Sequence, residues 1–344
     1  MDLPTYFSDF LSQIRPSDEM REAFKNAHNK LRRLLFKDAD LADSIVTTFL
    51  QGSYRRATAI RPVKSTRPDV DVVVVTKLDK NACQPKQALA RFKPFLQEHY
   101  VGSWGNNSRS LHITDTFFNV DLDLVITSAP SIADTGILSS HSIDVEPFSE
   151  IGELWKLSPL EIPDQEADRW QRTHPLAQIA WTVEKNSKTL GHYVNVVKAL
   201  KWWRRITPEF PAQPKSYPLE HMIGLCCPDE VKTVGSGIVR TLESICKRYG
   251  ETARNGEIPF LSAHGIINQN VFSNVSTLNF QQFLEHVKQA HDCASRALVA
   301  STVAESAQLW RTLFGDVFPD AEDGSGKLAG YRGANAKTGA GRFG

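Results

Sequence analysis

The sequence lacks the segments that mark secreted, membrane-spanning and disulfide-stabilised proteins. Its first ten residues, MDLPTYFSDF, show no basic start followed by an apolar stretch, so no signal peptide is expected. No apolar run approaches the ~18 residues that a membrane-spanning helix needs. Five cysteines in a chain of 344 residues are an odd number and too few for a disulfide framework. We therefore expect a soluble, cytoplasmic protein.

An excess of basic charge is also missing. The chain has 40 Lys and Arg against 39 Asp and Glu, and its net charge is +1. Four basic residues and no acidic one lie between Gly324 and Gly344, so the rest of the chain carries a net charge of −3. Proteins that coat nucleic acid carry a basic stripe, so there is no strong nucleic-acid-binding signal. The 41% of apolar residues are enough for a buried core, and the length suggests about two domains.

The first half of the chain predicts an α/β lobe. Residues 17–37 have apolar positions at helical spacing, with Ser17 as the N-cap and two acidic residues in the first turn. The valine-rich stretch Val70–Val75 is typical of a central strand buried on both faces. Three other stretches predict strands: Ile45–Leu50, Leu111–Ile113 and Phe117–Ile126.

The second half predicts a largely helical lobe. Residues 129–171 contain scattered prolines and are expected to form loops and short elements that join the lobes. We expect the α/β lobe with its N-terminal helix over residues 1–165 and the helical lobe over residues 166–320. Residues 321–344 are rich in glycine and nearly free of large apolar groups, so they predict a flexible tail.

Chemistry is concentrated between Gln51 and Val75. Asp69 and Asp71 lie two apart on a predicted strand, so both carboxylates share one face. Two unpaired carboxylates on so apolar a strand are costly, and a divalent cation such as Mg²⁺ removes that cost. Upstream, Gly52 and Ser53 follow a strand and can form a turn that binds phosphate oxygens. A phosphate site beside paired carboxylates predicts nucleotidyl transfer with two metal ions, Mg²⁺ or Mn²⁺.

Such a site needs a further carboxylate from a neighbouring strand. The segment NVDLDLVIT offers Asp121 and Asp123, which share one face. The further carboxylate would bind the catalytic metal and accept the proton of an attacking 3′-hydroxyl.

These motifs resemble the polymerase-β-like nucleotidyltransferases. The segment GSYRRATAIRP, followed by DVDVVVV, resembles the cGAS/DncV-like nucleotidyltransferases, or CD-NTases, of bacterial CBASS anti-phage systems. The segments VVKALKWWRR and PKSYPLEHMIG resemble the family's second lobe, which is similar to that of oligoadenylate synthases. The resemblance covers about residues 36–310. It implies a nucleotidyltransferase lobe with a mixed sheet and a mostly helical second lobe.

The resemblance also implies roles for single residues. Asp69 and Asp71 would hold the metals, and Asp123 fits the family pattern of Asp followed by two apolar residues better than Asp121 does. Five residues would bind the nucleotide: Gln51, Gly52, Ser53, Lys201 and Ser216.

Simpler explanations compete at several of these positions. Lys201 shares a helix face with Lys198 and Arg205, which could be a solvated basic face. Ser216 could simply cap a helix. Adjacent Cys226 and Cys227 lack the usual spacing of zinc ligands and are interpreted as buried cysteines.

The resemblance predicts an enzyme that joins nucleoside triphosphates, ATP among them, into a cyclic di- or trinucleotide for a downstream effector. The alternative is an RNA 3′-end nucleotidyltransferase, which shares the catalytic core. A catalytically dead nucleotide-binding protein is disfavoured because every expected acidic residue is present. The sequence leaves base choice, ring size, linkage, activating signal and oligomeric state open. Some CBASS operons encode a ubiquitin-transferase-like protein, and a tail ending at Gly344 fits conjugation through its terminal carboxylate.

Overall fold

A computed structural model describes residues 1–63, 66–141, 143–144 and 154–321. Its main sheet has five strands in the order β1-β2-β5-β4-β3. Only β2 and β5 run parallel; the other neighbours are antiparallel. The bounds are β1 Ile45–Gln51, β2 Asp69–Thr76, β3 Trp104–Asn106, β4 Leu111–Asp115 and β5 Val120–Thr127. Two short hairpins complete the strands: β6 Leu160–Asp164 with β7 Arg169–Thr173, and β8 Ser262–Ala263 with β9 Ile266–Asn270.

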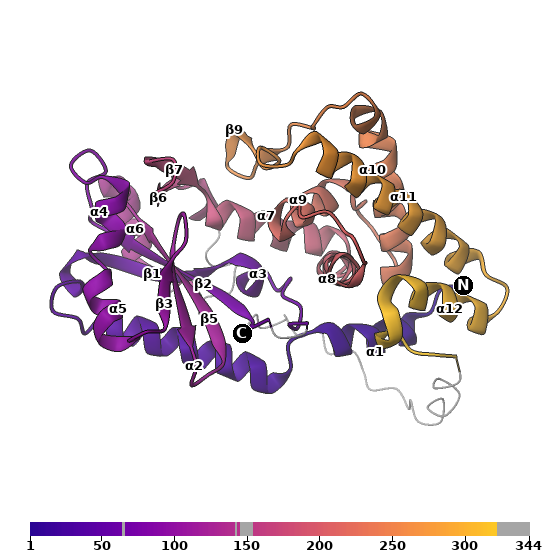
Figure 1. The fold of residues 1–344 in the computed structure, drawn as a ribbon, viewed down its shortest axis with the longest axis horizontal. Helices are drawn as coiled ribbons and strands as arrows, with labels where there is room; N and C mark the ends of the chain where they lie inside the picture. Colours follow the sequence, from indigo (N-terminus) through magenta and orange to yellow (C-terminus); the bar gives the residue numbers. More distant parts are fainter. Residues whose placement is uncertain (64–65, 142, 145–153, 322–344) are drawn as a thin grey trace.

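The helices fall into two groups, one in each lobe. Those of the α/β lobe are α2 Asp18–Leu35, α3 Gly52–Arg55, α4 Pro85–Ala90, α5 Lys93–His99 and α6 Ile132–Ser140. Those of the helical lobe are α1 Pro4–Ile14, α7 Pro175–Lys188, α8 Tyr193–Ile206, α9 Ser216–Cys226, α10 Val234–Arg254, α11 Thr277–Val299 and α12 Val303–Phe314. Figure 1 shows the sheet at one end and the orange and yellow helices at the other.

Strand β2 is buried on both faces, as its valines predict. Val70, Val72 and Val74 pack with residues of α2, α4 and α5 on one face. Val73 and Val75 pack on the opposite face, with Leu138 of α6 and residues of α7. Because side chains alternate along a strand, Asp69 and Asp71 project on this second face, at the strand's N-terminal end. The alternation therefore directs both carboxylates away from α2.

The expected elements of the α/β lobe are confirmed with small shifts. Ser17 caps α2 and accepts a hydrogen bond from the Met20 amide at 3.2 Å. The strand expected from Phe117 begins instead at Val120. The Asp115 carboxylate accepts hydrogen bonds from the amides of Phe117 and Phe118, at 3.1 and 3.2 Å, and folds them into a turn. These side-chain bonds compete with strand pairing.

The N-terminal helix joins the core of the helical lobe. Phe7 and Phe10 of α1 are buried in one cluster with α8, α10 and α12, and the Phe10 ring stacks on Phe314 at 4.6 Å between centroids. Figure 1 shows α1 reaching away from the sheet to lie beside α12. A boundary near residue 165 stays a prediction, but the first 14 residues pack with the second lobe. Trp202 and Trp203 lie in the same core.

Candidate active site

Three carboxylates converge at one edge of the sheet. The parallel register of β2 and β5 places Asp71 opposite Asp123 and Asp69 opposite Asp121. One carboxylate oxygen from each of Asp69, Asp71 and Asp123 lies within 4.8 Å of the other two. Hard divalent cations take such oxygen ligands, so this donor set fits Mg²⁺ or Mn²⁺. No other group of metal-ligating side chains is found among the residues that the structure describes.

Asp121 lies on the same face of β5 as Asp123 but is not part of the cluster. Its carboxylate instead lies 4.0 Å from Arg67 and 3.8 Å from His112. Asp123 accepts a hydrogen bond from the Asn107 amide at 3.1 Å, and its Oδ1 lies 3.4 Å from His112 Nδ1. The geometry thus brings Asp123, and not Asp121, to the pair on β2.

The clustering perturbs the acidity of all three groups. Burial and the neighbouring carboxylates raise the pKa of Asp69 to about 8 and that of Asp71 to about 6. Asp69 lies at the solvent-exposed end of the cluster. Its pKa is therefore raised by the like charges of the neighbouring carboxylates as well as by burial. Burial also raises the pKa of Asp123, and His112 opposes that rise. Without a cation these groups repel one another, which is the expected signature of a metal site.

Gly52 makes room for the acidic cluster. Its φ is +71°, and a Cβ placed there would lie 1.8 Å from Oδ2 of Asp71. Gln51 donates a side-chain hydrogen bond to Asp71, which stabilises the ionised form. Gly52 therefore has both a conformational and a steric reason to be glycine. The carbonyl of Ser53 accepts hydrogen bonds from the amides of Thr58 and Ala59, at 2.9 and 3.0 Å. These bonds fix the turn that follows α3.

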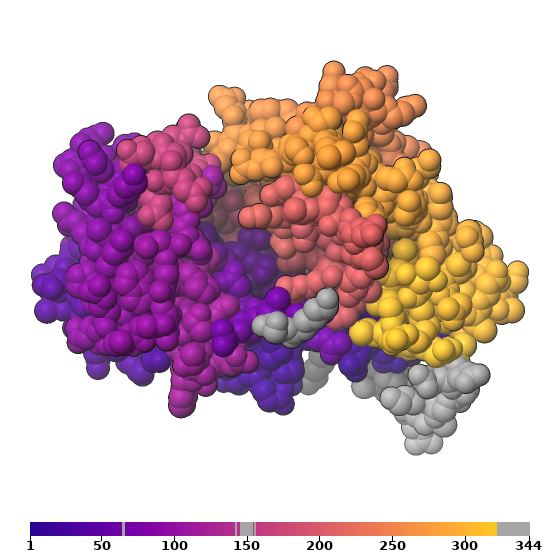
Figure 2. All heavy atoms as spheres, viewed as in Figure 1, coloured from indigo at the N-terminus to yellow at the C-terminus, as the bar shows by residue number. Residues whose placement is uncertain are grey.

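Except for Asp123, the predicted site residues that the structure describes line one cavity between the lobes. It has a volume of about 480 Å³, and Figure 2 shows the surface hollowed where the lobes meet. The α/β lobe contributes Gln51, Gly52, Ser53, Asp69 and Asp71, and the helical lobe contributes Lys201, Ser216 and Tyr217. A second hollow of about 580 Å³ adjoins it and shares Ser216 and Tyr217.

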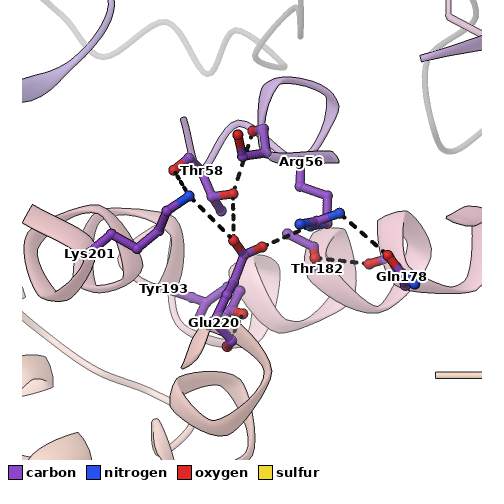
Figure 3. A network of polar contacts seen from close by, with 8 residues as sticks. Arg56, Thr58, Gln178, Thr182, Tyr193, Lys201 and Glu220 are labelled. Carbon is purple, nitrogen blue, oxygen red and sulfur yellow. Dashed lines mark hydrogen bonds and ion pairs between the residues drawn. The ribbon is translucent and has the colours of Figure 1, made fainter. Parts of the chain in front are cut away.

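Lys201 belongs to a buried network that joins the lobes, shown in Figure 3. Its Nζ donates to the Thr58 carbonyl at 2.9 Å and lies 3.7 Å from Glu220. Glu220 also accepts hydrogen bonds from Arg56 at 2.8 Å and from the Thr58 hydroxyl at 2.9 Å. Burial lowers the pKa of Lys201, and Glu220 opposes this. The helix face is therefore buried at Lys201, and the solvated-face explanation fails there.

The sequence analysis missed the residues that support the site. Asn107 and His112 hold Asp123, whereas Arg56 and Glu220 connect the turn after Gly52 to α9. None of them carries a local motif, since each acts through a partner far away in sequence. The remaining site residue of the sequence analysis, Gly344, lies outside the described residues. Within those residues, no helix is both long and apolar enough to span a bilayer.

Comparisons with known proteins agree with this geometry. Residues 1–136 match the family model described as "Second Messenger Oligonucleotide or Dinucleotide Synthetase domain". A cyclic AMP-AMP-GMP synthase from Enterobacter hormaechei subsp. hoffmannii (strain UCI 50) is 40% identical, with 93% of this chain and 92% of that protein covered. A cyclic AMP-AMP-AMP synthase from Acinetobacter sp. (strain ATCC 27244 / 9458) is 32% identical, with 91% and 84% covered.

A solved structure supports the fold. The CD-NTase CdnG of Bradyrhizobium diazoefficiens, in complex with GTP, superimposes with a TM-score of 0.70 at 12% identity. The alignment covers 90% of this chain and 94% of that one. The expected fold, a nucleotidyltransferase lobe with a mixed sheet and a helical second lobe, is confirmed. The chain belongs to the CD-NTases, the nucleotidyltransferases that synthesise cyclic oligonucleotide second messengers in CBASS defence.

Proposed function

We propose that this CD-NTase makes a cyclic trinucleotide from ATP and GTP, with two AMP units and one GMP unit. The observation that carries the catalytic part is the convergence of Asp69, Asp71 and Asp123 beside the turn at Gly52. The product assignment is supported by the 40% identity to a cyclic AMP-AMP-GMP synthase over 93% of this chain. The relative that makes cyclic AMP-AMP-AMP is less similar, at 32% identity.

The three carboxylates would hold two Mg²⁺ or Mn²⁺ ions. Such ions stabilise the attacking and leaving oxygens of an in-line displacement at phosphorus. The donor set fits them, because it consists of oxygen atoms and carries the negative charge that divalent cations neutralise. Asn107 and His112 fix the rotamer of Asp123, so its oxygens already point into the cluster.

The remaining residues bind and orient the nucleotide. Gly52 and Ser53 contact the triphosphate from the α/β lobe, with Gln51 beside them, while Lys201 and Ser216 contact it across the cavity. The 3′-hydroxyl of one nucleotide attacks the α-phosphorus of the next, Asp123 accepts its proton, and the bond to the bridging oxygen breaks to release pyrophosphate. Repeating the step and closing the ring gives the cyclic product. Positioning supplies much of the acceleration.

The test is product analysis with purified protein. α-Labelled ATP and GTP, singly and together, are incubated with Mg²⁺ and separately with Mn²⁺, treated with phosphatase and analysed by mass. We expect a phosphatase-resistant trinucleotide only when both are present, and none from the Asp69→Asn/Asp71→Asn variant. A cyclic product containing adenine alone would overturn the product assignment and leave the site intact. Linear extension of added RNA would favour the RNA 3′-end alternative, for which the relatives described above give no support.

Two partner predictions follow from the family. The cyclic product would act on a downstream effector, and a ubiquitin-transferase-like protein would conjugate the chain through Gly344. Mass spectrometry of the native protein, purified from its host, tests the second prediction. An intact, unlinked Gly344 in the presence of the partner genes would contradict it.

A further inference from the structure

The turn of the β8–β9 hairpin places a histidine in the second hollow. His264 and Gly265 form this turn, and His264 lines the hollow of about 580 Å³ that adjoins the catalytic cavity. The φ of Gly265 is +76°, and a Cβ placed there would lie 2.3 Å from the His174 ring. Glycine therefore lets the turn pack closely against the start of α7, which fixes the position of His264.

Two aromatic contacts fix the plane of the His264 ring. The ring stacks on Trp181 of α7, with the centroids 4.4 Å apart and an angle of 21° between the planes. It also contacts the His221 ring of α9, with the centroids 4.3 Å apart and an angle of 41°. Side chains from two helices thus hold the imidazole in one orientation before any ligand binds.

The ring nitrogens of His264 are available to a ligand. The side chain is half-buried, but neither nitrogen is covered by protein, and no hydrogen bond to either is found in the part of the chain that the structure describes. Burial of the ring and the nearby His221 lower the pKa of His264 to about 3, so the imidazole is neutral. A neutral imidazole offers one N–H donor and one acceptor nitrogen. His264 can therefore form either kind of hydrogen bond in the hollow.

The side of the hollow around His264 is uncharged. Residues 263–275 contribute only neutral side chains to the lining, among them Ile266, Gln269, Asn274 and Val275. The cationic residues of the hollow come from other segments, and no Asp or Glu is found among its described lining residues. These cationic residues are Arg109, Arg172, Arg204 and Lys215. Apolar groups with a few fixed polar ones suit a nucleobase, whereas cations suit phosphate groups.

The cationic side and the neutral side are arranged in the order that a nucleotide requires. Arg204, Ser216 and Tyr217 line both the catalytic cavity and the second hollow. The neutral residues of the hairpin line only the second hollow. A nucleotide with its phosphates at the shared wall would therefore direct its base towards the hairpin.

We infer that His264 is a specificity-determining residue, which selects between adenine and guanine by hydrogen bonding to the edge of a base in the second hollow. The inference rests on the proposed function, because it states how that reaction chooses its bases. Adenine carries an amino group, a donor, where guanine carries an oxygen, an acceptor. A ring held in one orientation distinguishes the two, since the wrong base leaves a polar group without its partner.

Product analysis of a shape-matched variant tests the inference. His264→Phe keeps an aromatic ring against Trp181 and removes both nitrogens. His286→Phe is the matched control, because His286 also stacks on an aromatic ring, that of Phe210 at 5.0 Å, and lines neither the catalytic cavity nor the second hollow. Equimolar α-labelled ATP and GTP are incubated with each purified full chain and Mg²⁺, and the phosphatase-resistant products are analysed by mass.

The readout is the amount of cyclic product with any other base composition, relative to the composition that the wild type mainly makes. We expect this ratio to rise ~5-fold or more in His264→Phe and to stay within ~2-fold of wild type in His286→Phe, since one lost base contact is enough for such a change. The ratio is defined whichever cyclic product the wild type makes. A wild type with a different main product would therefore overturn the product assignment alone and leave this comparison intact.

Three results would overturn the inference. An equal loss of every product in His264→Phe, with the ratio unchanged, would show that His264 only packs against its neighbours. Equal changes of the ratio in both variants would show that the effect does not depend on the hollow. Complete loss of product from folded His264→Phe would assign the residue to catalysis and not to the choice of base. If His264→Phe does not fold, as judged by circular dichroism, His264→Leu takes its place under the same criteria.

Discussion

At the scale of single residues, Asp123 and Asp121 make a matched pair on one strand. Asp123 meets Asp69 and Asp71, whereas Asp121 faces Arg67 and His112. We expect Asp123→Asn to lower the initial rate of pyrophosphate release by ~100-fold or more, because it removes a metal ligand. Asp121→Asn should cost less than ~10-fold, since it alters only a neighbour of the site.

The same assay contains its control. Both variants change one carboxylate to an amide of equal size on the same face of β5, so a difference between them reports the position. Equal losses in the two variants would contradict the assignment of the third carboxylate.

The acidic cluster should also set how stability depends on pH in metal-free protein. The pKa values of Asp69, about 8, and Asp71, about 6, lie above the usual 3.8, so the folded state keeps protons that the unfolded state releases. The free energy of unfolding contributed by these groups therefore falls as pH rises from about 4 to about 8. The Asp69→Asn/Asp71→Asn variant lacks this contribution, so its Tm advantage over wild type in EDTA should grow across that range.

Calorimetry at several pH values measures the difference. Saturating Mg²⁺ should stabilise the wild type more than the variant, because the ion binds only the intact cluster. A Tm difference that is constant with pH would show that the carboxylates are not perturbed.

At the scale of elements, Glu220 holds the turn after α3 against α8 and α9. It is buried between Arg56, Thr58 and Lys201, and all three contacts cross from one element to another. Glu220→Ala leaves two cations buried without their carboxylate, so we expect a loss of about 3–5 kcal/mol in the free energy of unfolding. Urea denaturation measures it.

A surface carboxylate provides the comparison. Glu243 pairs with Lys247 on the exposed face of α10, where ion pairs contribute little. Glu243→Ala should fall within the error of the same measurement. A Glu220→Ala variant as stable as the wild type would show that the network does not join the lobes.

The strands show how much of this part of the fold the sequence pattern predicts. The valine run of β2 predicts a buried central strand, and period two places Asp69 and Asp71 on one face. The predicted start of β5 is wrong by three residues. The turn before this strand is made by hydrogen bonds to the Asp115 side chain, which a periodic pattern of apolar residues does not reveal. Nor does any pattern show that β5 pairs with β2 in the register that brings Asp123 to Asp71.

At the scale of the whole molecule, the tail can be tested by removal. The composition of residues 321–344 predicts that they cannot form a core of their own. Of these, residues 322–344 follow Ala321, the last residue that the structure describes. Deleting them should leave the Tm within ~1 °C of the full chain and preserve synthesis of the cyclic product. Conjugation through Gly344 should be lost in the host. A fall in Tm of several degrees would show that the tail contributes to the folded core.

The sequence alone determined the family, the paired carboxylates and the turn at Gly52, because these are local: strand period, glycine conformation and motif spacing operate over a few residues. Only the tertiary structure decided the rest. It selected Asp123 through the parallel register of β2 and β5, placed α1 in the second lobe, and tied Lys201 to Glu220. These are contacts between distant parts of the chain, and side-chain packing of the whole molecule determines which of them form.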